Sequence, residues 1–213
     1  MDFEPKGFLY PELDKFPSFS PELDIGVMAS GDGTNFEAIL SSIRESHLDA
    51  KIKLLIVNNP ECNAINRAIK YSIPYKIIEH SQFNSREEFD IAICKEFAKY
   101  NVEGIVMAGW MRIVTKVLIN KFPNRIINLH PSLLPSFPGY NAIKQAIDGG
   151  SLITGCSTHY VSLDVDSGPL IAQAAIPIFS KYNYEQLRSH MRYFEHKILP
   201  MSIAIAGKEW RSI

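Results

Sequence analysis

The chain has 213 residues, of which 46% are hydrophobic and 21% charged, and its formal net charge is −1. This size and composition fit one soluble globular domain with a large core. The near-zero net charge gives no reason to expect nucleic acid as a partner, and the lack of any apolar run of about 20 residues excludes a membrane-spanning helix.

The N-terminal 20 residues mix charges, aromatic residues and prolines, and they lack the apolar segment of a signal peptide. We therefore expect a cytoplasmic protein. The three cysteines, Cys62, Cys94 and Cys156, are widely spaced, with no CxxC motif and no His/Cys cluster. This spacing favours reduced thiols and indicates neither a disulfide framework nor a zinc site.

Residues 1–23 are predicted to form an N-terminal arm, followed by one domain over residues 24–213. Four prolines within the first 22 residues are too dense for a regular helix or a central strand. Aromatic residues among them suggest that this irregular arm lies on the domain surface or on a partner chain.

Short apolar runs alternate with amphipathic runs from residue 25 to residue 148. Alternation at this spacing implies right-handed βαβ crossovers, and so an α/β fold with a mostly parallel twisted sheet and helices on both faces. The predicted strands are 25–29, 52–57, 75–78, 104–108 and 125–129, and the predicted helices are 36–43, 63–71, 85–100 and 142–148.

The pattern changes after residue 148. Two β-rich runs, 154–163 and 169–177, predict antiparallel strands that extend the sheet. A closing helix is predicted over 184–203, interrupted or bent near Pro200. This helix carries His190, Arg192 and Glu195, and most of these charges are expected to be solvated.

The first predicted strand runs into Ser30-Gly31-Asp32-Gly33-Thr34-Asn35 and then a helix. Glycines permit backbone conformations closed to other residues, and the amides at a helix start attract anions such as phosphate. This loop is neither a Gly-x-Gly-x-x-Gly fingerprint nor a Walker loop. The alternative interpretation is a tight turn without a ligand.

Two polar side chains stand together where the strand 125–129 ends. Asn128 and His130 are two residues apart, so they share one face of a strand, and three prolines stiffen the loop that follows. A second loop carries Asp166 on a glycine-proline turn, and a carboxylate near an imidazole orients it and favours its protonated form. The alternatives are a capping histidine and a turn-stabilising aspartate.

These motifs together resemble the phosphoribosylglycinamide formyltransferase (glycinamide ribonucleotide transformylase) family of folate-dependent enzymes. The resemblance covers about residues 24–205, with the family's motifs in the family's order. It is carried by residues 30–35, Ala108-Gly109-Trp110-Met111-Arg112-Ile113, Asn128 to Pro135 with Phe137-Pro138-Gly139, and His159 through Asp166-Ser167-Gly168-Pro169.

The resemblance implies a Rossmann-like formyltransferase fold and a transferase of purine biosynthesis. Such an enzyme moves the formyl group of the co-substrate 10-formyltetrahydrofolate to the amine of 5-phosphoribosylglycinamide. No metal, nucleic acid or membrane is expected, and the protein is expected to be a monomer or homodimer. The implied catalytic residues are Asn128, His130 and Asp166; the implied ribonucleotide-binding residues are Gly33, Thr34, Asn35 and Glu195; and the implied folate-binding residues are Arg86, Met111, Arg112, Ile113, Val114, Asn128, Ser162, Leu163, Asp164, Val165 and Asp166. Asp32 is expected to point outward, because a carboxylate inside the loop would repel phosphate.

The chemistry needs no covalent intermediate. An amine that attacks a formamide creates an oxyanion and an ammonium, so the site needs a hydrogen-bond donor and a proton route. Asn128 is expected to donate to the oxyanion, and protonated His130 to stabilise it and act as an acid. Asp166 is expected to keep His130 protonated and to relay protons through water.

Three alternatives remain. A Met-tRNA formyltransferase would carry an additional C-terminal domain, and a formyltetrahydrofolate deformylase would need an N-terminal regulatory domain. Neither is expected in a chain of this length. A non-catalytic nucleotide-binding module would leave the grouping of Asn128, His130 and Asp166 unexplained.

Overall fold

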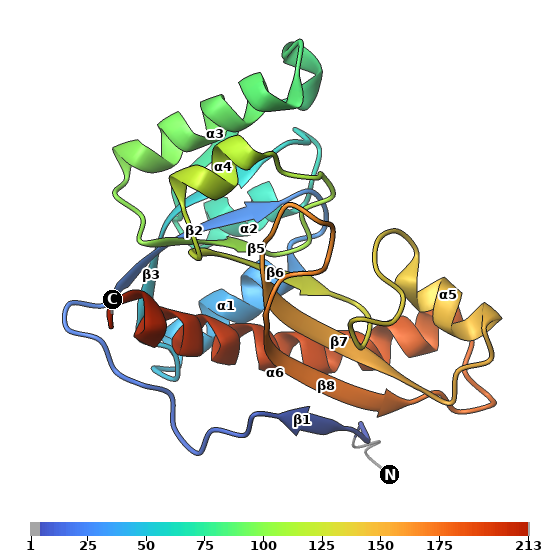
Figure 1. Cartoon of the computed structure of the whole chain (residues 1–213). Helices are drawn as coiled ribbons and strands as arrows, with labels where there is room; N and C mark the ends of the chain where they lie inside the picture. The colour runs from blue at the N-terminus through green and yellow to red at the C-terminus, as the bar shows by residue number, and fades with distance from the viewer. Residues whose placement is uncertain (1–4, 213) are drawn as a thin grey trace.

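In the computed structural model, residues 5–212 are described, and they contain one eight-stranded mixed sheet (Figure 1). The strand order is β1-β8-β7-β6-β5-β2-β3-β4. The strands β2 to β6 are parallel, whereas β7, β8 and β1 add antiparallel pairs, as the sequence predicted for the C-terminal part. The bounds are β1 Phe8–Tyr10, β2 Leu23–Ala29, β3 Ala50–Val57, β4 Tyr75–Ile77, β5 Gly104–Met107, β6 Ile126–His130, β7 Ile153–Tyr160 and β8 Leu170–Pro177.

Helices cover both faces of the sheet, which confirms the predicted fold class. In Figure 1, α3 and α4 lie above the sheet, and α1 and the long α6 lie below it. Each side has its own buried apolar cluster. The first side holds α1 Thr34–Arg44, α2 Ala64–Lys70, α5 Ala142–Asp148 and α6 Tyr184–Trp210; the second holds α3 Arg86–Lys99 and α4 Lys116–Lys121; a short 3-10 helix, η1 His80–Gln82, precedes α3.

The central strands are apolar throughout because both of their faces are covered. In β2, Val27 belongs to the apolar cluster between the sheet and α6, and Met28 belongs to the cluster between the sheet and α3. Gly26 faces the ring of Phe97, and a Cβ there would come within 2.3 Å of that ring. The lack of a side chain at Gly26 therefore leaves room for the Phe97 ring of α3 against the sheet.

The N-terminal arm lies on the domain surface and contains one regular element that the sequence did not predict. β1 pairs with β8, with Leu9 opposite Ala174, and so forms one edge of the sheet. Leu9, Phe16 and Phe19 pack against the large core cluster. Residues 1–4 of the predicted arm lie outside the described residues, and the division at residue 23 stays a prediction.

Several sequence predictions of secondary structure and burial need correction. Helix α6 runs without interruption through Pro200 to Trp210. Buried residues on both sides of Pro200, such as Leu199 and Met201, pack strongly enough to offset the cost of an interior proline, about 3 kcal/mol. The expectation that most of the charges at His190, Arg192 and Glu195 are solvated is wrong, because His190 is buried at 5% exposure and the other two are half-buried. Strand β7 ends at Tyr160, three residues before the predicted end, and the short elements α4 and η1 were not predicted.

Candidate active site

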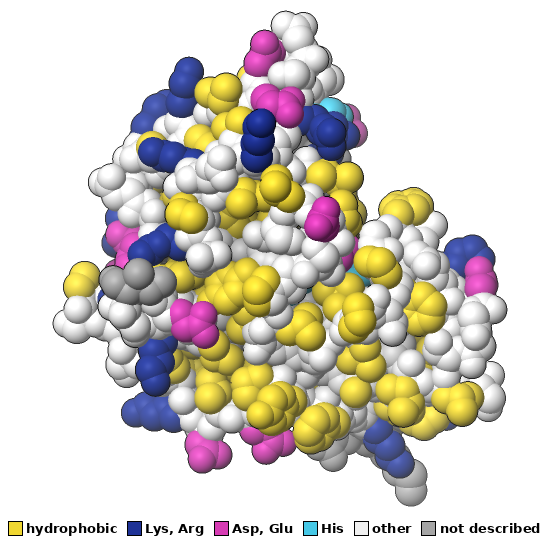
Figure 2. All heavy atoms as spheres, in the orientation of Figure 1, with side chains coloured by type: hydrophobic (Ala, Val, Ile, Leu, Met, Phe, Trp, Pro, Cys, Tyr) yellow, Lys and Arg dark blue, Asp and Glu magenta, His cyan; other side chains and the backbone are white. Residues whose placement is uncertain are grey.

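The predicted site residues meet in a cleft at the carboxyl ends of the parallel strands. Its volume is about 540 Å³, and Figure 2 shows the surface hollowed between the α3–α4 end of the molecule and α5. This position is the usual ligand site of open α/β sheets. The cleft is lined by residues 31–35, 107–114, 128–131, 139–143, 159 and 161–166, and by Tyr184, Arg188, Arg192 and Glu195 of α6.

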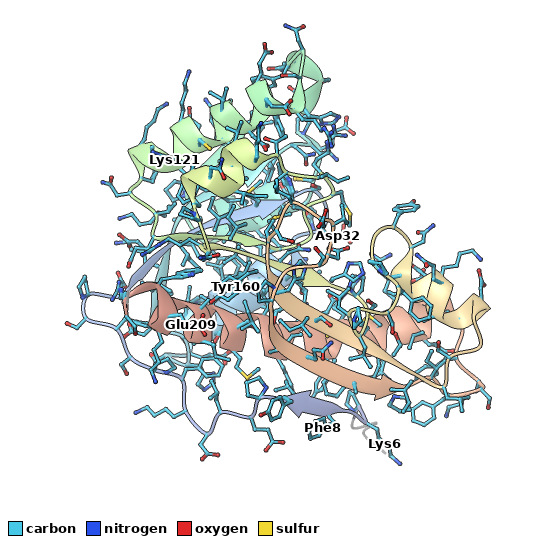
Figure 3. All side chains as sticks on the ribbon, in the orientation of Figure 1. Lys6, Phe8, Asp32, Lys121, Tyr160 and Glu209 are labelled. Atoms are coloured by element: carbon cyan, nitrogen blue, oxygen red, sulfur yellow. The ribbon has the colours of Figure 1, made fainter. Side chains whose placement is uncertain are left out.

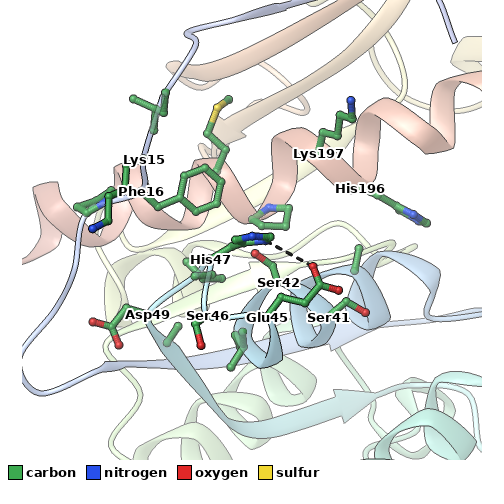
Figure 4. A pocket seen from close by; sticks show the side chains of 18 of the residues that line it. Lys15, Phe16, Ser41, Ser42, Glu45, Ser46, His47, Asp49, His196 and Lys197 are labelled. Atoms are coloured by element: carbon green, nitrogen blue, oxygen red, sulfur yellow. Dashed lines mark ion pairs between the residues drawn. The ribbon is translucent and has the colours of Figure 1, made fainter. Parts of the chain in front are cut away.

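A second, larger cavity of about 1250 Å³ lies between the arm, α1 and α6 (Figure 4). Its lining mixes charges of both signs, including Lys15 and Lys197 with Glu45 and Asp49, and Figure 4 marks an ion pair of 3.4 Å between His47 and Glu45. None of the three predicted catalytic residues lines it. The smaller cleft is therefore the candidate active site.

His130 and Asp166 form a buried ion pair in the cleft. His130 Nδ1 lies 3.1 Å from Asp166 Oδ2, which also accepts a hydrogen bond of 2.8 Å from the amide of Gly139. The other ring nitrogen of His130, Nε2, lies 2.9 Å from the carbonyl oxygen of Phe137. A carboxylate and a carbonyl can only accept, so both ring nitrogens of His130 face hydrogen-bond acceptors.

Asn128 faces the same carboxylate. Its Nδ2 lies 3.3 Å from Asp166 Oδ1 and 3.2 Å from His159 Nε2, so both amide hydrogens have acceptors. His159 donates from Nδ1 to the carbonyl of Tyr160 at 2.9 Å, and its Nε2 lies between Asn128 Nδ2, at 3.2 Å, and Asp166 Oδ1, at 3.5 Å. Asn128 must release one of these acceptors before it can donate to an oxyanion as expected.

The surroundings of Asp166 keep it ionised. Burial alone would raise the pKa of Asp166, but the adjacent His159 imidazole, the Gly139 amide and the charge of His130 together outweigh burial and lower that pKa. The backbone of Asp166 is left-handed, with φ of 51°, a conformation that aspartate tolerates better than most residues. The turn thus directs the carboxylate at His130.

The loop before α1, residues Ser30 to Gly33, is called the glycine loop here, and it ends in a residue that must be glycine. Gly33 caps α1 with φ of 71°, and an added Cβ would come within 2.8 Å of the Ala64 Cα. Asp32 is exposed at the mouth of the cleft (Figure 3), whereas Gly33 is buried. The first amides of α1, starting at Thr34, face no preceding helical turn and are available to an anion.

A polar pair lies between the glycine loop and α6. Asn35 Nδ2 donates to Glu195 Oε2 at 3.1 Å. Burial raises the pKa of Glu195, and the Asn35 hydrogen bond and the charges of Arg192 and Arg188 only partly offset it. The Oδ1 of Asn35 is buried without a hydrogen-bond partner among residues 5–212. The pair can therefore accept hydrogen bonds from a ligand amine.

Two segments predicted to bind folate form one wall of the cleft, and one predicted residue does not. Residues 111–114 and 162–166 line the cleft, with apolar side chains exposed at Met111, Ile113 and Leu163. Arg86 is exposed at the start of α3 and lies outside the cleft lining in the described part of the chain. Ser85 caps that helix by accepting from the Glu88 amide at 3.1 Å.

Sequence reasoning missed three basic side chains of the cleft: His159, Arg188 and Arg192. The two arginines precede Glu195 at positions i−7 and i−3, so one face of a helix carries all three, and this spacing was a usable signal. His159 stands opposite Asn128 in the antiparallel pairing of β7 with β6. That register was not readable from the sequence.

Two further properties concern residues 5–212 as a whole. No group of three or more His, Cys, Asp or Glu side chains within that range is placed to hold a metal ion. None of the helices described there is long and apolar enough to cross a membrane.

Comparison with known proteins places the chain in a family. The Formyl transferase family model matches residues 23–203. Phosphoribosylglycinamide formyltransferase of Bacillus subtilis is 38% identical over 177 residues, which cover 83% of this chain and 91% of the relative. The trifunctional purine biosynthetic protein adenosine-3 of Gallus gallus is 36% identical over 87% of this chain, but the match spans only 18% of that longer protein.

Solved structures agree with the sequence comparison. Glycinamide ribonucleotide transformylase 1 from Symbiobacterium toebii superposes with a TM-score of 0.87 at 36% identity and covers 90% of each chain. The region that the family model matches, residues 23–203, includes the glycine loop, the Asn128–His130 strand end, the Asp166 loop and most of α6. On this evidence the chain belongs to the formyl transferase family.

Proposed function

We propose that this protein transfers the formyl group of 10-formyltetrahydrofolate to the amine of 5-phosphoribosylglycinamide in purine biosynthesis. One observation carries the proposal: the Asn128–His130–Asp166 cluster and the Asn35–Glu195 pair line the same cleft. The first suits acyl transfer, and the second suits an amine. The names of the relatives point to the same acceptor.

The ribonucleotide would lie along the glycine loop. Its phosphate would accept hydrogen bonds from the amides of Gly33 and Thr34, with Arg188 and Arg192 adding positive charge from α6. Its amine would donate to Asn35 and Glu195: the Oδ1 of Asn35 is buried without a partner among residues 5–212, and the Glu195 carboxylate already accepts from Asn35. The amine would then lie in the cleft that His130 also lines.

The folate would occupy the wall formed by residues 111–114 and 162–166. Exposed Met111, Ile113 and Leu163 would cover an aromatic ring system, and main-chain groups of the two loops would recognise its polar edge. Arg86 would contact the distal, negatively charged end of the folate, away from the cleft lining. No metal is needed in this scheme.

His130 would act where the formyl oxygen becomes negative. The amine attacks the formyl carbon, a C–N bond forms, and the oxyanion accepts from His130 Nε2, which exchanges the Phe137 carbonyl for the substrate. The attack converts the amine into an ammonium. Its proton reaches the folate nitrogen through Asp166 and water as the bond between that nitrogen and the formyl carbon breaks. Asn128 would donate to the same oxyanion after releasing Asp166 or His159.

A formyl-transfer assay with three acceptors tests the proposal. The enzyme is mixed with 10-formyltetrahydrofolate and either glycinamide ribonucleotide, Met-tRNA or water alone. Transfer to the ribonucleotide at a rate far above the other two is expected. A higher rate with Met-tRNA or water would show a different member of the family, and binding without transfer to any acceptor would indicate a non-catalytic module.

A further inference from the structure

Two residues of helix α2 donate hydrogen bonds to successive carbonyl oxygens of the glycine loop, on the side away from the cleft. Arg67 Nε donates to the main-chain oxygen of Asp32 at 2.8 Å, and the Ala64 amide donates to the oxygen of Gly31 at 3.2 Å. Gly31, Asp32 and Gly33 line the cleft, whereas Ala64 and Arg67 lie outside its lining as far as residues 5–212 show. The loop is thus sandwiched between α2 and the cleft.

These two bonds determine where the loop amides point. In a planar trans peptide the C=O and N–H directions are opposite. Because the carbonyls of Gly31 and Asp32 point to α2, the N–H groups of Asp32 and Gly33 point away from α2 and toward the cleft. Consecutive amides turned to one side form an anion-binding concavity, which continues into the first amides of α1 at Thr34.

Arg67 is itself held in one orientation. Its guanidinium also donates from Nη1 to Glu37 on α1, and Glu37 lies 3.3 Å from the Tyr71 hydroxyl and 3.8 Å from Lys70 Nζ. The side chains of Arg67 and Glu37 are only 20% and 29% exposed. A planar guanidinium can serve a carbonyl and a carboxylate at once with fixed geometry, which a lysine ammonium matches poorly.

We infer that Arg67 is a positioning residue for phosphate recognition: through the Asp32 carbonyl it holds the Gly33 amide toward the bound phosphate without touching the ligand. In the proposed function, on which this assignment of the ligand rests, the phosphate is that of the phosphoribosyl substrate. Arg67 thereby connects the packing of α1 against α2 to the affinity of the loop.

The orientation of the amide is tested directly by ¹⁵N amide spectra during a titration with inorganic phosphate. In the wild-type protein the Gly33 and Asp32 signals are expected to shift and saturate. In Arg67→Met, which keeps the aliphatic stem, the shift is expected to be lost or to need about 10- to 100-fold more phosphate, the cost of one hydrogen bond to a charged group. Glu37→Gln is the matched control, because the Gln amide oxygen can still accept from Arg67 Nη1. Only the charge of the ion pair is removed, and Arg67 stays oriented toward the Asp32 carbonyl.

Kinetics supply the second readout. Arg67→Met should raise the KM for glycinamide ribonucleotide by a similar factor, while the KM for folate changes less than about threefold and Glu37→Gln changes both little. Arg67→Lys should be intermediate, and it replaces Arg67→Met if melting curves show that the latter is unfolded. A wild-type Gly33 signal that ignores phosphate, or one that responds equally in Arg67→Met, would overturn the inference. Failure of the wild type to formylate the ribonucleotide, with the phosphate response intact, would instead refute only the proposed function.

Discussion

His130 Nδ1 and Asp166 Oδ2 are 3.1 Å apart, and the exposed fractions of the two side chains are 7% and 10%. The pair is therefore shielded from solvent screening, and neither group can be changed without leaving its partner with an unmatched buried charge or donor.

Replacing Asp166 with Asn should lower kcat by about 100-fold or more, since positioned acid–base groups contribute about 10²- to 10⁴-fold. Substrate KM values should change much less, because the shape of the site is retained. Steady-state kinetics check this, with Asp148→Asn as control, because Asp148 is exposed and pairs with Lys144 away from the cleft. A kcat within threefold of wild type would contradict the assigned role.

The lowered pKa of Asp166 also predicts a pH dependence of stability. A carboxyl whose pKa is lower in the folded state stabilises that state above its unfolded pKa of about 3.9, and this stabilisation is lost as pH falls through the folded pKa. The difference in unfolding free energy between wild type and Asp166→Asn should therefore be constant near neutrality and shrink below about pH 4. Denaturant unfolding at several pH values measures it.

Glu195 should show the opposite sign. Its raised pKa means that the ionised carboxylate is disfavoured in the fold, so wild-type stability should fall as pH rises above the unfolded value of about 4.3. Glu195→Gln should remove this fall and be as stable as wild type or more so near neutrality, yet bind the ribonucleotide more weakly. Melting curves across pH, combined with calorimetric binding, test both halves; a less stable Glu195→Gln protein would count against buried charge as the cause.

Gly33 should not tolerate any side chain. In Gly33→Ala the Cβ would meet the Ala64 backbone at 2.8 Å while φ is 71°, so the loop must shift and its amides with it. The ribonucleotide KM is expected to rise far more than the folate KM. Gly31→Ala is the matched comparison, since an added Cβ there meets nothing within 4 Å, and an equal rise of both KM values in Gly33→Ala would defeat the phosphate assignment.

The reaction as proposed uses only proton transfer and hydrogen-bond donors from His130, Asn128 and Asp166. Activity is therefore expected to survive exhaustive dialysis against EDTA. Loss of activity after dialysis, restored by one divalent cation but not by buffer alone, would show that a metal takes part.

The sequence was sufficient for the parallel core of this fold, because buried parallel strands are apolar throughout and alternate with amphipathic helices. It was also sufficient for Asn128 and His130, since their spacing places them on one strand face. It was not sufficient where distant packing decides. Pro200 predicts a helix interruption locally, but the buried residues around it hold α6 together.

The candidate site was predictable to the extent that its residues follow strand ends. The partnership of Asn128 with His159 depends on the register of β7 against β6, which no local pattern reveals. The partial burial of Glu195 depends on how α6 crosses the start of α1, where Asn35 donates to it. Because the sequence does not show that crossing, most of the charges on α6 were expected to be solvated.

The short strand β1 has a consequence for the handling of the protein. It pairs with Gln173, Ala174 and Ala175 on the outer side of β8, a strand whose sequence from Leu170 to Ile176 is almost entirely apolar and uncharged. If residues before position 11 were deleted, β8 would present a row of unpaired N–H and C=O groups, a template on which strands of other chains can add. The segment that contains β1 precedes the region matched by the family model, and it would then be what protects this edge of the sheet from aggregation.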